Sequence, residues 1–303
     1  MPRLDRILRD RGLSASQARD ALRWGKVFLD GIPTSLGGRE IRRPERVEHR
    51  PEATRLQPGR DVAFVHVDEH LAVVWKPAGL LAVPAPRRDG HQSVLGEVGR
   101  KLGRVLPVHR LDEPTSGLMM VARTAPAQLA LKDLLEAHDV ERRYLALVKG
   151  RLPEDEMRVE TIFIRDRGDG LRGSAHQGTD PLDGRRAVTN LVHLDTFERG
   201  VTLVGATLET GRTHQVRIHL AELGCPVLGD PLYAKRHITG MAPRLALHAA
   251  ALGFTHPMTG DELRFRAPLA DDLVSVIGGL REPEERPRGR GRAPRRDPRR
   301  RKK

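Results

Sequence analysis

The 303-residue chain contains one cysteine, few aromatic residues and no long apolar run. The single thiol, Cys225, excludes a disulfide framework and is typical of a protein in a reducing cytosol. Aromatic residues make up 3% of the chain, which argues against a sheet that stacks many RNA bases on aromatic rings. The N-terminus lacks the apolar segment of a signal peptide, and the most apolar stretch, 245–254, is shorter than the roughly 18 residues of a membrane helix. We therefore expect a soluble cytoplasmic protein without a membrane partner.

The excess positive charge lies at the two ends of the chain. The net charge is +13, of which residues 1–60 contribute +6 and residues 281–303 contribute +8. The intervening residues 61–280 therefore carry a net charge of only −1. A nearly neutral body with basic ends suggests a catalytic domain that its attachments deliver to a polyanion. Many basic proteins bind no nucleic acid, so charge alone does not decide the function.

The C-terminal segment, 281–303, reads REPEERPRGRGRAPRRDPRRRKK and lacks apolar side chains that could form a core. Pro and Gly residues interrupt its charges, so we expect a disordered basic tail. Such a tail would attract phosphates without regard to sequence; the alternative is that it only increases solubility.

Residues 1–60 have the pattern of a small folded domain. The segment RLDRILRD has apolar residues at helical spacing, and Gly12 is placed to end this helix. Ser14 or Ser16 can cap a second helix. The segment VFLDGIPT, 27–34, then predicts a β-hairpin around its Asp-Gly pair.

The second predicted helix carries positive side chains at helical spacing. Arg19, Arg23 and Lys26 recur at intervals of four and three residues and would form one basic stripe. Alone, such a stripe is more often a solvated helix face. The order of two short helices, a basic stripe and a hairpin resembles an S4 RNA-binding domain, which implies that these three residues contact RNA.

The body of the chain alternates between short apolar strands and isolated helices. The segment DVAFVHVDEHLAVVWKP, 61–77, predicts two strands across an Asp-Glu turn, and TNLVHLDTF with VTLVGATLE predicts an antiparallel hairpin. Helices are predicted at 126–138 and between Gly211 and Gly224. We therefore predict an α+β fold with a mixed, largely antiparallel sheet for residues 61–280.

One charged segment, HRLDEPTSG at 109–117, lies between apolar runs. It brings Asp112 into a setting where a charge is costly unless it is paired or hydrogen-bonded. A kinase catalytic loop begins similarly, but no Gly-rich phosphate loop precedes this one, and an aspartic protease would need a second such carboxylate. The segment alone leaves two interpretations, a catalytic carboxylate or a structural ion pair between Asp112 and Arg110.

Three separated segments resemble the motifs of RluA-type pseudouridine synthases, in the family's order. They are HRLDEPTSG, RRYLALVKG and GRTHQVRIHLAELGCPVLGDPLYA, and the resemblance extends over residues 62–270. It implies an enzyme that isomerises uridine within RNA, cleaving the bond from N1 to the ribose and rejoining the base through C5, without a metal or a redox cofactor. In this family an aspartate attacks the sugar or base, or removes a ribose proton, and Asp112 is the matching position.

The resemblance also implies roles for other residues. Arg217 matches the cation that keeps the desolvated carboxylate ionised. Tyr144 matches a tyrosine whose ring packs on the base and whose hydroxyl is a candidate for removing the C5 proton; a strand tyrosine that only faces the core is the alternative. Arg110 lies two residues before Asp112, on the same face of a strand, and would fill the gap left by the extruded uridine. Arg212 is expected to order its loop or to contact phosphate.

Other polar residues suggest a metal site that their spacing does not support. Five residues from His214 to His219 place the two rings poorly for one helix face, and no acid or second cysteine completes a set with Cys225. We therefore expect no metal. Residues 115–117 are expected to shape a turn, because no base is placed to activate a serine.

Two features depart from the family pattern. Many members have Asn where this chain has Trp75, before Lys76 and Pro77, so packing would replace a local hydrogen bond. Residues 165–186 look longer and more irregular than a simple strand connection, and we expect a mobile loop near RNA there.

The substrate expected from the resemblance is ribosomal RNA of the large subunit, and transfer RNA is the alternative. A different class of function is an RNA-binding, ribosome-associated factor that keeps the fold without the chemistry. The presence of Asp112, Tyr144 and Arg217 together favours the enzyme. A glycosidase would need a second positioned carboxylate, which the sequence does not supply. We expect a monomer.

Overall fold

The computed structural model describes residues 1–23, 26–29, 32–33, 41, 43–52, 61–85, 92–175 and 184–281. Three predictions therefore fall wholly or partly outside the described residues. They concern the basic tail at 281–303, the domain boundary at residue 60 and the centre of the segment 165–186.

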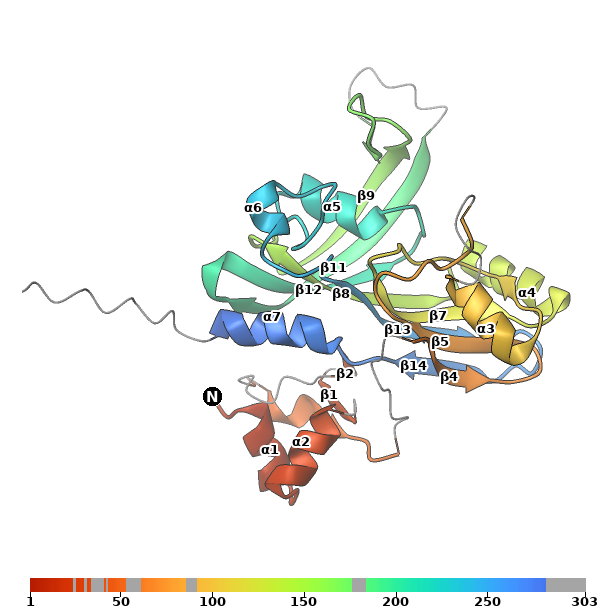
Figure 1. Ribbon diagram of the computed structural model, residues 1–303. Helices are drawn as coiled ribbons and strands as arrows, with labels where there is room; N and C mark the ends of the chain where they lie inside the picture. The colour runs from red at the N-terminus through yellow and green to blue at the C-terminus, as the bar shows by residue number, and fades with distance from the viewer. Residues whose placement is uncertain are drawn as a thin grey trace, which may run out of the picture.

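One large sheet forms most of the molecule (Figure 1). Within the described residues it has 11 strands, in the order β10-β9-β11-β12-β8-β13-β7-β5-β4, with β14 paired to β13 and β6 paired to β7. The strands are β4 (Ala63–Val67), β5 (Leu71–Lys76), β6 (Leu106–Pro107), β7 (Ser116–Ala122), β8 (Glu141–Lys149), β9 (Glu156–Ile164), β10 (Gly173–Ser174), β11 (Arg185–Phe197), β12 (Val201–Leu208), β13 (Leu247–Thr255) and β14 (Glu262–Arg266). Their pairs are antiparallel except for β7 with β13. The predicted α+β fold with a mixed, largely antiparallel sheet is confirmed.

Strands β5 and β7 are buried on both faces of this sheet. Successive side chains of a strand point to opposite faces, and on β5 they join two different hydrophobic clusters. Ala72 and Val74 belong to a larger cluster, whereas Val73 and Trp75 belong to a smaller one. Burial on both faces explains why these strands have continuous apolar sequences. The indole of Trp75 packs within the smaller cluster, 4.9 Å from the ring of His248.

Helices cover both faces of the large sheet (Figure 1). They are α3 (Val94–Leu102), α4 (Ala125–Glu136), α5 (Gln215–Glu222), α6 (Arg236–Thr239) and α7 (Asp271–Arg281). Val98 of α3 and Leu273 of α7 pack in the larger cluster, and Leu131 of α4 packs in the smaller one. The helix predicted at 126–138 is α4, which ends earlier because His138 has a left-handed backbone with φ 66°. None of the helices in the described ranges combines the length and the apolar character needed to cross a membrane.

The N-terminal residues form a separate small sheet with two helices. Its elements are α1 (Leu4–Asp10), α2 (Ala15–Arg23), β1 (Val27–Leu29), β2 (Ile32–Pro33), the 3₁₀ turn Pro44–Arg46 and β3 (Val47–His49), with strand order β2-β1-β3. A hydrophobic core of their own includes Leu4, Leu8 and Leu22. The hydroxyl of Ser14 accepts from Gln17 N at 3.2 Å while Gln17 Oε1 accepts from Ser14 N at 2.8 Å, and this reciprocal cap starts α2. The two predicted helices and the hairpin pairing are confirmed.

The predicted basic stripe is not a single helix face. Helix α2 ends at Arg23, so Lys26 lies beyond it, and the Lys26 ammonium donates to the carbonyl of Pro51. Arg19 is exposed on α2, and its Nε donates to the carbonyl of Ala15 at 3.2 Å. The three residues do not share one helix face, because α2 ends before Lys26.

Gly117, at the start of β7, leaves no space for a side chain. A Cβ at this position would lie 2.2 Å from the carbonyl oxygen of Ala249 on β13, and its φ is +116°. We expect Gly117→Ala to lower the free energy of unfolding by about 3 kcal/mol, since overpacking adds to backbone strain. Urea denaturation measures this loss. Gly168→Ala is the control, because its φ is +106° but nothing lies within 4 Å of its Cβ; it should cost about 1 kcal/mol. Equal losses would contradict the close-contact explanation.

Candidate active site

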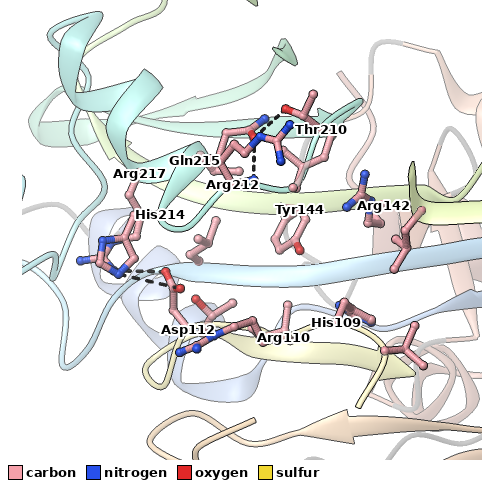
Figure 2. Close-up of a pocket in the computed structure, with 18 of the residues that line it drawn as sticks. His109, Arg110, Asp112, Arg142, Tyr144, Thr210, Arg212, His214, Gln215 and Arg217 are labelled. Carbon is pink, nitrogen blue, oxygen red and sulfur yellow. Dashed lines mark hydrogen bonds and ion pairs between the residues drawn. The ribbon is translucent and has the colours of Figure 1, made fainter. Parts of the chain in front are cut away.

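A cavity of about 560 Å³ lies where three segments of the chain meet. Its walls come from residues 108–115 before β7, from β8, and from residues 208–217 around the start of α5. Figure 2 shows side chains of these segments directed toward one another. The volume is in the range of sites that bind small ligands. The three motifs noted in the sequence therefore meet at one site.

Asp112 lies in an irregular loop and not in a strand. Residues 108–115 connect β6 to β7, and the N–H of Thr115 donates to the carbonyl of Asp112 at 3.0 Å. The expectation that Arg110 and Asp112 share a strand face is therefore wrong, because the chain turns at Glu113 and Pro114 before β7 begins. Arg110 is exposed and forms no hydrogen bond or ion pair with the described residues, so the structural pair with Asp112 is not formed.

A buried lysine holds the loop that carries Asp112. Lys76, the last residue of β5, is fully buried, and its Nζ donates to the carbonyls of Pro77, Leu80 and Glu113 at 2.9, 2.7 and 2.8 Å. Burial lowers the pKa of Lys76 to about 7, although the negative charge of Asp112 opposes this shift. The backbone beside Asp112 is thereby fixed to the segment that follows β5.

Arg217 binds two carboxylates at once (Figure 2 shows its contact with Asp112). Its Nε and Nη2 donate to Asp230 Oδ2 and Oδ1, each at 2.8 Å, while its Nη1 donates to Asp112 Oδ2 at 3.1 Å. The bidentate contact sets the plane of the guanidinium, and this orientation directs the third nitrogen at Asp112. The Arg217 side chain is 3% exposed. Its positive charge therefore lies against the Asp112 carboxylate.

The charge of Asp230 is fully buried and compensated from several sides. Burial alone would raise the pKa of Asp230, but the hydrogen bonds and charge of Arg217, with the N–H groups of Leu232 and Tyr233, hold it below its usual value of 3.8. These amides donate to Oδ1 at 2.9 and 3.2 Å. Asp230 therefore stays ionised at neutral pH and keeps Arg217 in place.

His214 lies beside the second oxygen of Asp112. Its Nε2 is 3.9 Å from Asp112 Oδ1, and its Nδ1 is 3.0 Å from the hydroxyl of Tyr233. The residue caps α5 with a left-handed backbone, φ 61°, a conformation that is uncommon outside glycine and concentrates at functional sites. Burial lowers the pKa of His214, so its ring is neutral at neutral pH. Asp112 Oδ1 accepts no hydrogen bond from the described residues and is free for a substrate.

Tyr144 and Arg142 lie two residues apart on β8 and both line the cavity (Figure 2). Tyr144 is 9% exposed, and burial raises the pKa of its hydroxyl to about 12. It belongs to the larger hydrophobic cluster as well as to the cavity wall. Arg142 donates from Nη2 to the carbonyl of Glu209 at 2.9 Å. This approach requires Gly211, where a Cβ would lie 2.6 Å from Arg142 Nη1.

Arg212, one of the predicted RNA contacts, lines the cavity and orders its loop. Its Nε donates to the carbonyl of Arg186 at 3.0 Å, and its backbone N–H donates to Gln215 Oε1 at 2.9 Å. Gln215 is buried and donates in turn to the carbonyl of Val188 at 2.9 Å. Arg110 also lines this cavity, whereas the N-terminal residues Arg19, Arg23 and Lys26 do not.

The residues considered for metal binding lie in separate contacts. His219 is 2.9 Å from Thr189 Oγ1 through Nδ1 and 3.0 Å from Thr161 Oγ1 through Nε2. The thiol of Cys225 donates to the carbonyl of Arg151 at 2.8 Å. In the part of the chain that the structure describes, no group of three or more His, Cys, Asp or Glu side chains could hold a metal ion.

Three side chains of this site were not predicted from the sequence. Lys76 was named only as the residue after Trp75, and His214 was considered only as a metal ligand. Asp230 lies among apolar residues in the segment CPVLGDPLYA. A charge there is costly unless it is paired, as for Asp112, and this cost could have identified Asp230 from the sequence as a residue with a buried partner.

The family model described as RNA pseudouridylate synthase matches residues 70–222 of this chain, a range that contains Asp112, Tyr144 and Arg217. The dual-specificity RNA pseudouridine synthase RluA of Haemophilus influenzae is 38% identical over 221 residues, covering 73% of this chain and 97% of that protein. The ribosomal large subunit pseudouridine synthase D of Xanthomonas campestris pv. campestris is 35% identical over 295 residues, covering 90% of this chain and 86% of that protein.

A solved structure of human RNA pseudouridylate synthase domain containing 1 has the same fold. Its TM-score is 0.59 at 24% identity, and the match covers 76% of this chain and 100% of that chain. The fold, the family match over the cavity residues and the two bacterial relatives agree with one another. The chain therefore belongs to the RNA pseudouridylate synthase family, within its RluA and RluD type, and is an enzyme that modifies RNA.

Proposed function

We propose that this enzyme isomerises uridine in a structured segment of RNA and that Asp112 performs the cleavage of the glycosidic bond. The observation that carries the proposal is the position of Arg217, which is fixed by buried Asp230 and donates its remaining nitrogen to Asp112. A cation held in this way stabilises a carboxylate in a poorly hydrated cavity without requiring the substrate to supply the charge.

The Asp112 carboxylate has one oxygen bound to Arg217 and one available to a substrate. Oδ2 accepts from Arg217, while Oδ1 accepts no hydrogen bond from the described residues and lies 3.9 Å from His214 Nε2. Attack on the sugar or base and removal of a ribose proton both require such an oxygen. Either route is compatible with this arrangement.

The isomerisation conserves the atoms of the substrate. The bond from N1 to C1′ breaks and a bond from C5 to C1′ forms, while C5 loses one proton and N1 gains one. No electrons are added or removed. The residues at the cavity therefore have to hold the base while it turns, stabilise charge and move protons.

Tyr144 is proposed to pack its ring on the base and to accept the C5 proton through its hydroxyl. Burial raises the pKa of this hydroxyl to about 12, so it is protonated at neutral pH. The balance closes if the hydroxyl gives its own proton to N1 and takes the C5 proton in its place. The charge of Arg142 on the same strand face opposes the rise and would stabilise the phenolate that forms.

Access to the uridine requires that the base leave its stack. Extrusion of a base costs a few kcal/mol and is easiest in a loop or at a weak pair. Arg110 is exposed at the cavity and has no partner among the described residues, which suits a role in filling the gap left in the RNA. A structured loop is therefore the proposed target.

Large-subunit ribosomal RNA is the proposed substrate. The relative named for that substrate aligns over 90% of this chain, whereas the dual-specificity relative aligns over 73%. The small N-terminal unit with its own core is proposed to be an S4-like RNA-binding domain, with Arg19 exposed on α2 as a contact. Transfer RNA remains the alternative, and an RNA-binding factor without catalysis is the second candidate function.

Asp112→Asn tests the proposed chemistry directly. Transcripts of large-subunit ribosomal RNA and of transfer RNA are labelled with tritium at uridine C5, and its release is followed. We expect release by the wild type and a loss of at least roughly a thousandfold in the variant, because the amide cannot act as a nucleophile or base. RNA affinity, measured by filter binding, should stay unchanged. Tight binding without release by the wild type would favour the non-catalytic factor.

Tyr144→Phe separates the ring from the hydroxyl. We expect unchanged RNA affinity and single-turnover tritium release slowed by about a hundredfold or more, because the base is still covered but the proton acceptor is gone. Tyr144→Ala, which removes the ring as well, should also weaken binding. Wild-type release rates in Tyr144→Phe would leave only the packing role.

Asp230→Asn tests the support of Arg217. We expect release slowed by about tenfold to a hundredfold through misplacement of Arg217, and stability at pH 7 lowered by about 3 kcal/mol. The folded-state pKa of Asp230 lies below 3.8, so its contribution is present above about pH 4 and is lost as the pH falls through that folded value. Thermal melts should therefore show the variant approaching the wild type below about pH 4.

Asp155→Asn, in an exposed ion pair with Arg151, is the control and should change little. A constant stability difference across this range would contradict the assignment.

A further inference from the structure

A second cavity, of about 280 Å³, adjoins the active site. Four arginines line it, Arg165, Arg172, Arg185 and Arg212, and none of the described residues that line it is acidic. Two of these arginines, Arg185 and Arg212, together with Gly211, also line the active-site cavity. The two cavities therefore share a wall that is rich in positive charge.

The cations of this second cavity are not neutralised within the described protein. Arg165, Arg172 and Arg185 are exposed and form no hydrogen bond or ion pair with the residues that the structure describes. Arg212 uses its Nε on the carbonyl of Arg186, which carries no net charge. The cavity thus contains positive charges without a counterion from the described chain.

The two described acids that lie between Arg165 and Arg172 in sequence are engaged elsewhere. Asp166 Oδ1 accepts from the N–H groups of Gly168 and Gly170, both at 2.8 Å. Asp169 Oδ2 accepts from Arg167 Nε at 3.0 Å and from Nη2 at 2.8 Å. The arrangement of this turn therefore leaves Arg165 and Arg172 without an acid on either side.

The opposite face of the same strands shows the contrasting arrangement. Arg186 follows Arg185 on β11 and points to the other face, where its Nε donates to Glu160 at 2.6 Å. Arg158 on β9 donates to Glu209 at 3.0 Å from both Nε and Nη2. Arginines are thus neutralised on one face of the β9–β11 pair and left unpaired on the face that meets the cavity.

The segment that carries Arg172 is attached to α5. Next to it in β10, the Ser174 backbone N–H and hydroxyl donate to the two carboxylate oxygens of Glu222, at 2.8 and 2.6 Å, and the hydroxyl lies 2.9 Å from Thr161 Oγ1. These contacts hold the segment that carries Arg172 beside α5.

We infer that this basic cavity binds a phosphodiester group of the substrate RNA, next to the uridine that enters the active site. The inference rests on the proposed function, because it takes the base in the first cavity to be an extruded uridine. Planar guanidinium groups bind phosphate oxygens with paired hydrogen bonds, and the close like charges are relieved when a phosphate enters. Because the two cavities share a wall, the bound phosphate would belong to the same RNA strand as the target base.

The test is the salt dependence of RNA binding by the variant Arg165→Gln/Arg172→Gln/Arg185→Gln. Filter binding of a large-subunit ribosomal RNA transcript at several salt concentrations gives the slope of log Kd against log salt. Loss of one phosphate contact reduces the slope by about 0.7 on a single strand, so we expect a reduction of about 0.7 and a Kd raised several-fold. In the variant Arg165→Gln/Arg172→Gln, whose two arginines line only the second cavity, tritium release at saturating RNA should stay within about twofold of the wild type.

Two controls separate charge at this cavity from general charge loss and from misfolding. Arg186→Gln removes the neighbouring cation on the paired face and should leave the slope unchanged. Arg165→Lys/Arg172→Lys/Arg185→Lys keeps the charge and should keep most of the slope. The single variants Arg172→Gln and Arg185→Gln, at exposed positions, should each lower the slope by no more than about 0.7, and they cover the case in which the triple variant does not fold.

The inference is overturned if the triple and single Gln variants keep the wild-type slope, or if Arg186→Gln lowers it equally. These outcomes are independent of the proposed function, since binding is measured without turnover. A wild type that releases no tritium would contradict the proposed function, while a slope lowered only at the cavity arginines would still assign the phosphate contact.

Discussion

The active site depends on one guanidinium that is shared between two acids of different exposure. Asp230 is fully buried and binds Arg217 with two hydrogen bonds, whereas Asp112 is 17% exposed and receives one. A buried ion pair adds little to stability on average, because desolvation offsets most of the attraction. The ion pair instead fixes positions. Buried Asp230 sets the guanidinium of Arg217, and Arg217 in turn donates to the more exposed Asp112. Lys76 does the same for the backbone, by holding the carbonyl next to Asp112.

Much of this site could be predicted from the sequence, because each of its motifs is a continuous segment. The apolar patterns predicted the fold class. The motifs that contain Asp112, Tyr144 and Arg217 identified three segments that meet at the cavity. The loop geometry was not predictable, since an apolar run before HRLDEPTSG looks the same whether a strand continues or turns at Pro114. The partnership of Arg217 with Asp230 and the three acceptors of Lys76 depend on tertiary contacts, which neither periodicity nor spacing encodes. The basic stripe failed for a simpler reason, because spacing cannot show that α2 stops at Arg23.

The net charge of this protein does not show on which face of the sheet its unpaired arginines lie. The body of the chain is nearly neutral in sequence, yet β9 and β11 carry paired arginines on one face, while Arg185 on the other face and Arg165 and Arg172 beyond the strands have no partner among the described residues. A summed charge therefore underestimates how strongly one surface attracts a polyanion. The same distinction separates Arg110, which has no partner among the described residues, from Arg142, which is buried against the carbonyl of Glu209.

The position of β13 in the sheet has a consequence for how the enzyme is made. This strand lies between β8, which carries Tyr144, and β7, which follows the loop of Asp112, although it is among the last segments of the chain. Until residues 247–255 have left the ribosome, the two halves of the site have no strand to join them. Contacts between segments so distant in sequence form slowly, and the loop closures they require are unfavourable until the whole set is made. In a nascent chain, Asp112 and Tyr144 therefore lie in segments that no common strand joins until β13 has been made.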